Sequence, residues 1–208
     1  MLAAFRRLGD TKPARRAEGI GRGSGRIASA PARAAWAEAL VPTQHGMRPL
    51  RAVIPGDRVL TFDDHDVAVA AVSRGFATGY DDGGLLKIAA GAAGNRHETI
   101  VTAGQRVMVE SDAAEAETGD PFALVPAAEL AALPGVARIA TDVPVEMIAL
   151  HFDAEQVVPV AGGLLMHCLA ASEAGAMDCL LRQRAAAPRY AEMAAPGAAA
   201  RGARLAWF

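Results

Sequence analysis

The sequence predicts an all-β domain built from short strands, and three observations support this prediction. Between residues 58 and 169 most of the chain consists of short runs that alternate apolar and polar residues or are rich in Val, Ile and Thr. Turn-forming Gly, Pro, Asp and Asn separate these runs. Aromatic residues make up only 5% of the chain, so the core has to come mainly from Val, Leu, Ile and Ala, which suits β-strands. Together these features indicate a sandwich, barrel or pseudo-barrel and argue against βαβ units.

The expected strands follow one another after a turn at Pro55, Gly56 and Asp57. They cover residues 58–62, 67–73, 85–89, 98–102, 106–110, 136–141, 145–152, 156–160 and 163–169. Further turns fall at residues 81–84 and 91–95, where Asp, Gly and Asn tolerate a positive φ. Two short helices are predicted elsewhere. They cover residues 126–133, which begin with a proline, and residues 172–184, which begin with a Ser-Glu pair.

Composition divides the chain into three parts. Residues 1–38 form a basic, flexible N-terminal arm that is rich in Gly, Pro and Arg, residues 39–170 form the β domain, and residues 171–208 form a C-terminal helix and tail. The arm carries eight basic residues against Asp10, Glu18 and Glu38, a net charge of +5, which leaves −7 for the remainder of a chain whose total is −2. The basic residues are Arg6, Arg7, Lys12, Arg15, Arg16, Arg22, Arg26 and Arg33.

The composition also argues against several functional classes. No aromatic residue is interleaved with the early arginines, so nucleic-acid binding is not expected. Cys168 and Cys179 are too few for a disulfide framework and lack paired zinc spacing, which predicts a reduced, cytoplasmic setting with no metal site or other cofactor. The first residues are not expected to form a secretion signal, and no apolar window is long enough to predict a membrane span. A partner, where there is one, is expected to be another protein.

Four segments are more specific than the strand pattern. They are residues 46–62 with the Gly56-Asp57 turn, residues 91–110 with Thr102, residues 122–127 with a Leu-Val-Pro-Ala run, and residues 145–168, which end in His167 and Cys168. In sequence and in order they resemble Hint domains, the hedgehog and intein family, and in particular short bacterial Hint-domain proteins. This resemblance implies a Hint-type pseudo-barrel or horseshoe of short strands with one or two short helices and flexible termini.

The resemblance also implies a chemistry. Hint domains rearrange the peptide bond that precedes their first residue, where a Cys or Ser attacks the preceding carbonyl. Counting back from Gly46 places Ala34 at that position, and alanine has no nucleophile. The family's Thr-x-x-His block keeps Thr102 here but has Gln105 in place of the histidine. Glutamine hydrogen-bonds an amide but does not shuttle a proton near neutral pH.

At the far end of the domain, inteins carry a His-Asn pair in which the histidine helps the asparagine to cyclise. The chain has His167 followed by Cys168, so the histidine is kept and the cyclising residue is not. Because neighbours on a strand point to opposite faces, Cys168 is expected in the apolar core, and His167 is expected to point toward the vestigial site near Thr102.

These substitutions lead to three hypotheses. The first is a catalytically degenerate Hint domain, not an active enzyme, that serves as a structural or protein-interaction module and keeps Thr102, His167 and Cys168 as vestiges of a catalytic site. The second is a residual autoproteolytic domain that cleaves off its own basic arm through another nucleophile. The third is an unrelated all-β thiol enzyme, in which His167 beside Cys168 supports a reactive thiolate.

Overall fold

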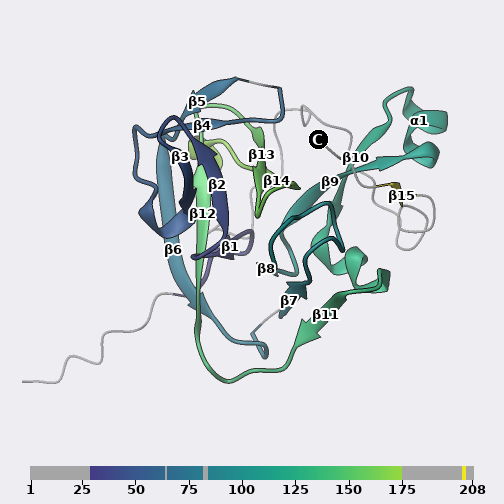
Figure 1. Cartoon of the computed structure of the whole chain (residues 1–208), viewed down its shortest axis with the longest axis horizontal. Coiled ribbons are helices and arrows are strands. Elements are labelled where there is room, and N and C mark those ends of the chain that lie inside the picture. Colours follow the sequence, from purple (N-terminus) through teal and green to yellow (C-terminus); the bar gives the residue numbers. More distant parts are fainter. Residues whose placement is uncertain (1–28, 64, 82–83, 175–202, 205–208) are drawn as a thin grey trace, which may run out of the picture.

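The protein is an assembly of three antiparallel sheets that wrap around one main apolar core (Figure 1). The computed structural model describes residues 29–63, 65–81, 84–174 and 203–204. Within these residues strands predominate, helices are short, and no sheet closes into a barrel. The all-β prediction is therefore confirmed.

The largest sheet has six strands in the order β11-β7-β8-β1-β12-β6. Their bounds are β11 (Val136–Ile139), β7 (Leu85–Ile88), β8 (Thr99–Thr102), β1 (Ala35–Trp36), β12 (Val145–His151) and β6 (Ala71–Ala77). The two-residue strand β1 sits in the middle, where Ala35 pairs with Val101 on one side and with Ile148 on the other. Strand β1 therefore joins the two halves of this sheet.

The second sheet has four strands in the order β3-β2-β4-β5, namely β3 (Gly46–Pro49), β2 (Leu40–Thr43), β4 (Arg58–Leu60) and β5 (Asp66–Ala68). Residues 67–73 are expected to form one strand, but the structure divides them between β5 and β6. The chain crosses from one sheet to the other at this point: the Val69 N–H donates to Asp57 O and the Ala70 N–H donates to His151 O. Because the N–H groups of Val69 and Ala70 bond to different parts of the fold, β5 ends at Ala68 and β6 begins at Ala71.

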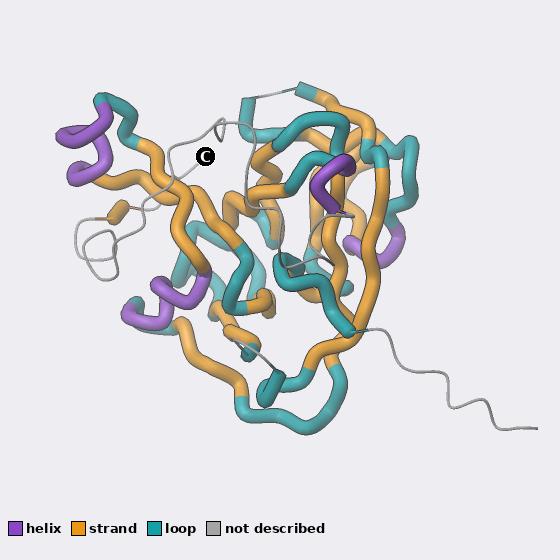
Figure 2. The backbone as a smooth tube through the Cα atoms, turned by 180° about the vertical axis from the view of Figure 1, so that it is seen from behind, coloured by secondary structure: helices purple, strands orange, loops and turns teal. Residues whose placement is uncertain are grey.

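The third sheet runs β10-β9-β14-β13, with strands β10 (Phe122–Pro126), β9 (Arg106–Ser111), β14 (Leu164–Cys168) and β13 (Gln156–Val160). Near the chain's end, β15 (Ala203–Arg204) also pairs with β9. Strands β9 and β10 run out from the body of the domain as a hairpin, and both views show it projecting with a helix at its tip (Figures 1 and 2).

The helix at that tip, α1 (Asp112–Thr118), is absent from the sequence-based prediction. Ser111 caps its N-terminus by accepting the Ala114 N–H, and Gly119 ends it in the left-handed conformation, with φ of 78°. The predicted helix at 126–133 forms as the 3₁₀ helix η2 (Ala127–Ala132), and a second one, η1 (Leu50–Ala52), follows β3. The predicted helix at 172–184 begins within α2 (Ala171–Ala174); its remainder lies outside the described residues.

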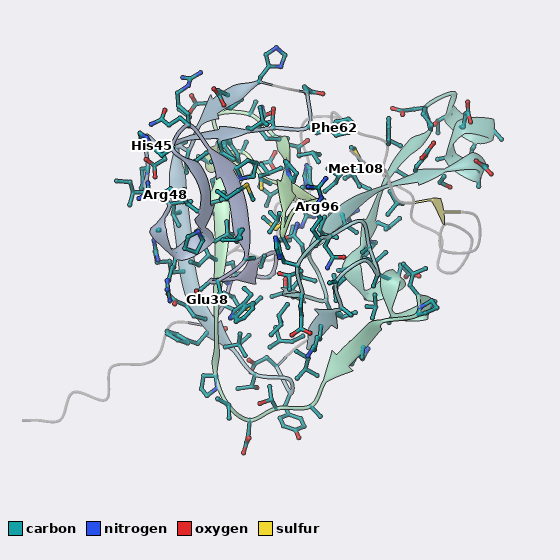
Figure 3. The ribbon with its side chains drawn as sticks, in the orientation of Figure 1. Glu38, His45, Arg48, Phe62, Arg96 and Met108 are labelled. Atoms are coloured by element: carbon teal, nitrogen blue, oxygen red, sulfur yellow. The ribbon has the colours of Figure 1, made fainter. Side chains whose placement is uncertain are left out.

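The core follows the two-residue alternation of the strands. In β14, Leu164, Met166 and Cys168 face the main core, whereas Leu165 faces a second cluster on the opposite side of the sheet. That second cluster comprises Met108, Leu124, Val157 and Leu165, with Phe62 and Phe122 against it. Figure 3 labels Phe62 and Met108 close together at the base of the projecting hairpin.

The structure describes only part of the predicted flexible arm, because residues 1–28 lie outside the described part. Most of the predicted C-terminal helix and tail, including residues 175–202, also lies outside it. Residues 29–38, which composition assigns to the arm, instead pack against the sheets, and Ala34, Ala35 and Ala37 are buried. The division of the chain at residues 39 and 171 stays a prediction. No helix among the described residues is long and apolar enough to cross a membrane.

Candidate functional site

The site is built around Ala34, which immediately precedes β1 and is completely buried. Its main-chain N–H donates to the Thr102 hydroxyl at 3.0 Å, and its carbonyl accepts the Thr102 N–H at 3.0 Å. The Thr102 hydroxyl itself lies 2.9 Å from the Ala32 carbonyl and 3.3 Å from the Ala34 carbonyl, so it can donate its one proton to either. Thr102, at the end of β8, therefore clamps residues 32–34.

Two glycines let this segment approach the body of the domain closely. A Cβ on Gly75 would lie 2.2 Å from Ser29 O, and a Cβ on Gly104 would lie 2.9 Å from Ala32 O. The Ala30 N–H also donates to Phe76 O at 3.0 Å. Residues 29–34 therefore pack directly against Gly75 and Gly104, and we call these two glycines the glycine track. A larger residue at position 75 or 104 would obstruct the packing of residues 29–34.

Gln105, which stands where the family has a histidine, has a structural role here. It is 1% exposed, and its side-chain amide donates to His167 O at 2.8 Å and to Arg106 O at 2.7 Å. Both N–H groups of the amide are thereby occupied by main-chain carbonyls. Gln105 ties the turn before β9 to strand β14.

His167 has a buried side chain that lies beside Glu155, with 3.7 Å between Nε2 and the Glu155 carboxylate oxygen. Burial lowers the pKa of His167; the Glu155 carboxylate acts to raise it, and the positive charges of Arg33 and Arg106 lower it further. The loss of hydration on burial lowers the pKa of His167 by more than the Glu155 carboxylate raises it. His167 is therefore neutral near pH 7, and it lies close to the residue that precedes Ala34.

His151 is a member of the site that the sequence pattern did not single out. It ends β12, it is 5% exposed, and its Nε2 lies 2.9 Å from the Ser73 hydroxyl. Its Nδ1 has no hydrogen-bond partner within the described part of the chain. Burial lowers the pKa of His151. In the sequence, only the place of His151 on an expected strand could have pointed to its role in the site. Its neighbours in the site are distant in sequence, so no local motif contains them.

A small cavity brings several of these groups together. It is lined by Arg33, Gln105, Ala149, Leu150, His151, Met166, His167, Cys168 and Leu169. The predicted site residues His167 and Cys168 therefore share one cavity with Gln105. Thr102 does not line the cavity and reaches the site through residues 32–34. Among the residues that the structure places, no three His, Cys, Asp or Glu side chains come together as a metal site requires.

Cys168 is a free thiol that packs in the main core. It is 3% exposed, and its Sγ lies 3.8 Å from Met166 O. Burial raises the pKa of the Cys168 thiol to about 12, because the thiolate would lose its hydration. The thiol is protonated at neutral pH, and the expected core position of Cys168 is confirmed.

Comparison with known proteins gives one family. The profile described as "Hint domain" matches residues 35–169. No curated protein matches the chain.

Three solved structures resemble the chain at low identity. A bacterial intein-like domain from Clostridium thermocellum is 16% identical, with 65% of this chain and 98% of that chain covered and a TM-score of 0.49. The MchDnaB-1 intein is 14% identical, with 64% and 98% covered and a TM-score of 0.46. A splice-inactive variant of the AceL NrdHF class 3 split intein is 12% identical, with 67% and 99% covered and a TM-score of 0.48.

Proposed function

Because this chain belongs to the Hint domain family, we propose that it is a Hint domain that no longer cleaves itself and that serves as a structural or protein-interaction module. One observation carries the proposal. Ala34 occupies the clamp formed by Thr102, yet a methyl group is all that its side chain offers. This supports a site in which the peptide is positioned as the family's reaction requires while residue 34 has no atom to attack with.

The first step of the family's reaction needs a nucleophile on residue 34. That atom would attack the carbonyl carbon of Arg33, and the bond to the nitrogen of Ala34 would break as the new ester or thioester forms. The Thr102 hydroxyl accepts the Ala34 N–H and lies within hydrogen-bond distance of the carbonyls of Ala32 and Ala34. It is engaged in holding the peptide, and this supports a positioning role for Thr102.

The same step needs a group that transfers protons to the leaving nitrogen. Gln105 stays neutral, and both of its N–H groups already serve main-chain carbonyls. Losing a general acid or base lowers a rate by ~10²–10⁴-fold. His167 remains nearby, but its lowered pKa leaves it neutral near pH 7, so it carries no extra proton to give to the leaving nitrogen. These features support the loss of the proton relay together with the nucleophile.

The thiol of Cys168 does not compensate for these losses. Because its pKa is raised to about 12, the thiolate that would act as a nucleophile is scarce at neutral pH. Its position in the core also keeps the sulfur away from solvent. Both the residual autoproteolytic domain and the all-β thiol enzyme are therefore less well supported than the inactive Hint domain.

The cellular compartment of the protein and the kind of partner that it binds are also proposals. A free, buried Cys168 is compatible with the reduced cytoplasmic setting that the cysteine content predicts. A protein partner is proposed in preference to nucleic acid, because the arginines before Ser29 have no interleaved aromatic residues to stack on bases.

Intact-mass measurement tests the proposal. The purified full chain is incubated with dithiothreitol or with hydroxylamine, which intercept thioesters and esters, and its mass is followed over days. A single unchanged mass is the expected result. A fragment that ends at Arg33, or one that ends at Cys168, would contradict the loss of cleavage.

A further inference from the structure

Two buried histidines lie in one cavity that a surface segment helps to close. His151 of β12 and His167 of β14 both line the cavity described above. Of the residues that line it, Arg33 comes from the segment before β1, residues 29–34, which we call the docked segment, and the others come from later parts of the chain. Docking of this segment therefore brings a permanent positive charge to a cavity that holds two titratable side chains.

The docked segment is held by few contacts. The Ala30 N–H donates to Phe76 O at 3.0 Å, and the Thr102 hydroxyl binds the main chain of Ala32 and Ala34. Five of its six side chains are those of Ser, Ala or Pro, so they bury little apolar area, and Ala32 is exposed. Release of this segment is therefore a local opening that needs less free energy than unfolding of the sheets.

The closed cavity disfavours the protonated form of His151. Its Nε2 lies 2.9 Å from the Ser73 hydroxyl, whereas its buried Nδ1 has no hydrogen-bond partner in the described part of the chain. A protonated imidazole carries an N–H at both nitrogens, so the second N–H would be buried without an acceptor. A charged donor in that position is costly, and contact with water after opening would remove the cost.

His167 faces charges of both signs. The Glu155 carboxylate lies 3.7 Å from Nε2, and the positive charges of Arg33 and Arg106 oppose protonation. Glu155 and Arg106 belong to the body of the domain, whereas Arg33 leaves with the docked segment. Cys168, which shares the cavity, adds no charge because the pKa of its thiol is about 12. Release of the segment therefore removes one of the charges that oppose protonation of His167.

We propose that the docked segment is an acid-released latch: proton uptake by His151 and His167 drives residues 29–34, with Arg33, off the glycine track while the sheets stay folded. Release breaks hydrogen bonds and no covalent bond, so the proposal goes beyond the loss of cleavage and is independent of it. Mild acid would thereby expose the Thr102 clamp and the end of the basic arm.

The test follows hydrogen exchange by NMR in the full chain between pH 5.5 and 7.5, after correction for the pH dependence of intrinsic exchange. The Ala34 amide reports docking, because it donates to the Thr102 hydroxyl. Its protection factor is expected to fall roughly 10-fold between pH 6.5 and 5.5, which corresponds to the uptake of about one proton on opening.

Urea distinguishes local release from unfolding of the whole domain. Val101 is completely buried and pairs with Leu86, and its N–H points toward β7 because that of Thr102 points toward Ala34. Low concentrations of urea should speed exchange at Val101 and leave Ala34 nearly unchanged, because release of a short segment exposes little surface.

Histidine variants test which groups take up the proton. His151→Gln with His167→Gln should leave the protection of Ala34 nearly constant between pH 6.5 and 5.5, because neither side chain can titrate. The matched control, His97→Gln, changes an exposed histidine that does not line the cavity and should keep the full fall.

Arginine variants test the charge that leaves with the docked segment. Arg33→Gln should reduce the fall in Ala34 protection to roughly 3- to 5-fold, because His167 no longer loses a repelling charge on release. Arg33→Lys keeps the positive charge and should keep the fall. The change with pH is compared and not the level, so weaker docking at neutral pH does not obscure the result.

Three results would overturn the proposal. The first is an equal fall in the double histidine variant and in His97→Gln. The second is equal acceleration of Ala34 and Val101 by urea, which would assign the opening to unfolding of the domain. The third is an equal fall in Arg33→Gln and Arg33→Lys. An intact chain whose Ala34 protection does not change with pH would contradict this inference alone and leave the proposed loss of cleavage standing.

Discussion

The main-chain nitrogen of Ala34 lies 3.0 Å from the hydroxyl oxygen of Thr102, which is 68 positions further along the chain. This contact places the peptide between Arg33 and Ala34 at the end of β8, where Thr102 also approaches the carbonyl of Ala32. The clamp thus holds the peptide bond that precedes Ala34, a residue whose side chain carries no nucleophile.

Replacing Thr102 with valine keeps the shape of the side chain and removes the clamp. The buried N–H of Ala34 loses its acceptor, so Thr102→Val should lower the free energy of unfolding by about 1–3 kcal/mol in urea titrations. Thr99→Val is the control on the same strand: the Thr99 hydroxyl is buried without a partner among the described residues, so its removal should be neutral or stabilising. Equal losses in both variants would argue against the clamp.

Restoring the two missing groups should restore cleavage. In a chain that carries Ala34→Cys and Gln105→His, the new thiolate attacks the Arg33 carbonyl, and dithiothreitol then releases a fragment that ends at Arg33. Ala34→Cys alone should react ~10²–10⁴-fold more slowly, because it lacks the proton relay. Adding Thr102→Val should suppress the reaction. An intact mass for the double variant would show that further parts of the machinery are missing.

The glycine track predicts where trypsin cuts. In the unchanged chain, cleavage is expected in the basic arm before Ser29, while the bond after Arg33 resists because residues 29–34 are docked. Gly75→Ala places a Cβ 2.2 Å from Ser29 O and should make the bond after Arg33 cleavable. Gly104→Ala, with 2.9 Å to Ala32 O, should have a milder effect. Equal resistance in all three chains would contradict the track.

The two buried histidines predict a loss of stability in mild acid. Burial lowers the pKa of His151 and of His167 from the ordinary value of 6.5, so below pH 6.5 the unfolded chain binds more protons than the folded chain. The free energy of unfolding should therefore be highest above pH 6.5 and should fall as the pH drops from 6.5 through the folded pKa values. Urea titrations between pH 5 and 8 check this, and His151→Gln with His167→Gln should flatten the profile. An unchanged slope in that variant would assign the effect to other groups.

Cys168 should be inert as a thiol and important as a core residue. Cys168→Ser places a hydroxyl in an apolar setting and should destabilise the fold by roughly 1–3 kcal/mol, whereas His167→Ala should cost less. In a Cys179→Ser background, a maleimide should label Cys168 slowly at pH 7.5, because the pKa of its thiol is about 12. Rapid labelling with an unchanged melting temperature for Cys168→Ser would support the thiol-enzyme hypothesis instead.

The sequence predicted those parts of the fold that depend on local pattern. Two-residue alternation in β14 placed Cys168 on the core side with Met166, and the structure confirms it. The Hint resemblance, which depended on ordered blocks of short motifs, is confirmed by the family match over residues 35–169.

The remaining features depend on contacts between distant segments. Residues 29–34 have the composition of a linker, and only Gly75 and Gly104, far along the chain, make a track for them. His151 joins the cavity through the packing of β12 against β14. The helix α1 was missed because its run of Ala and Glu has no apolar face, although Ser111 and Gly119 are recognisable boundary residues.

The central position of β1 bears on how the chain folds. Ala35 pairs with Val101 and with Ile148, so the six-stranded sheet is completed only when residues far apart in the sequence meet. Such long loops close slowly compared with hairpins. During synthesis, the six-stranded sheet therefore cannot be completed until Ile148 has left the ribosome, whereas Ala35 can pair with Val101 before then.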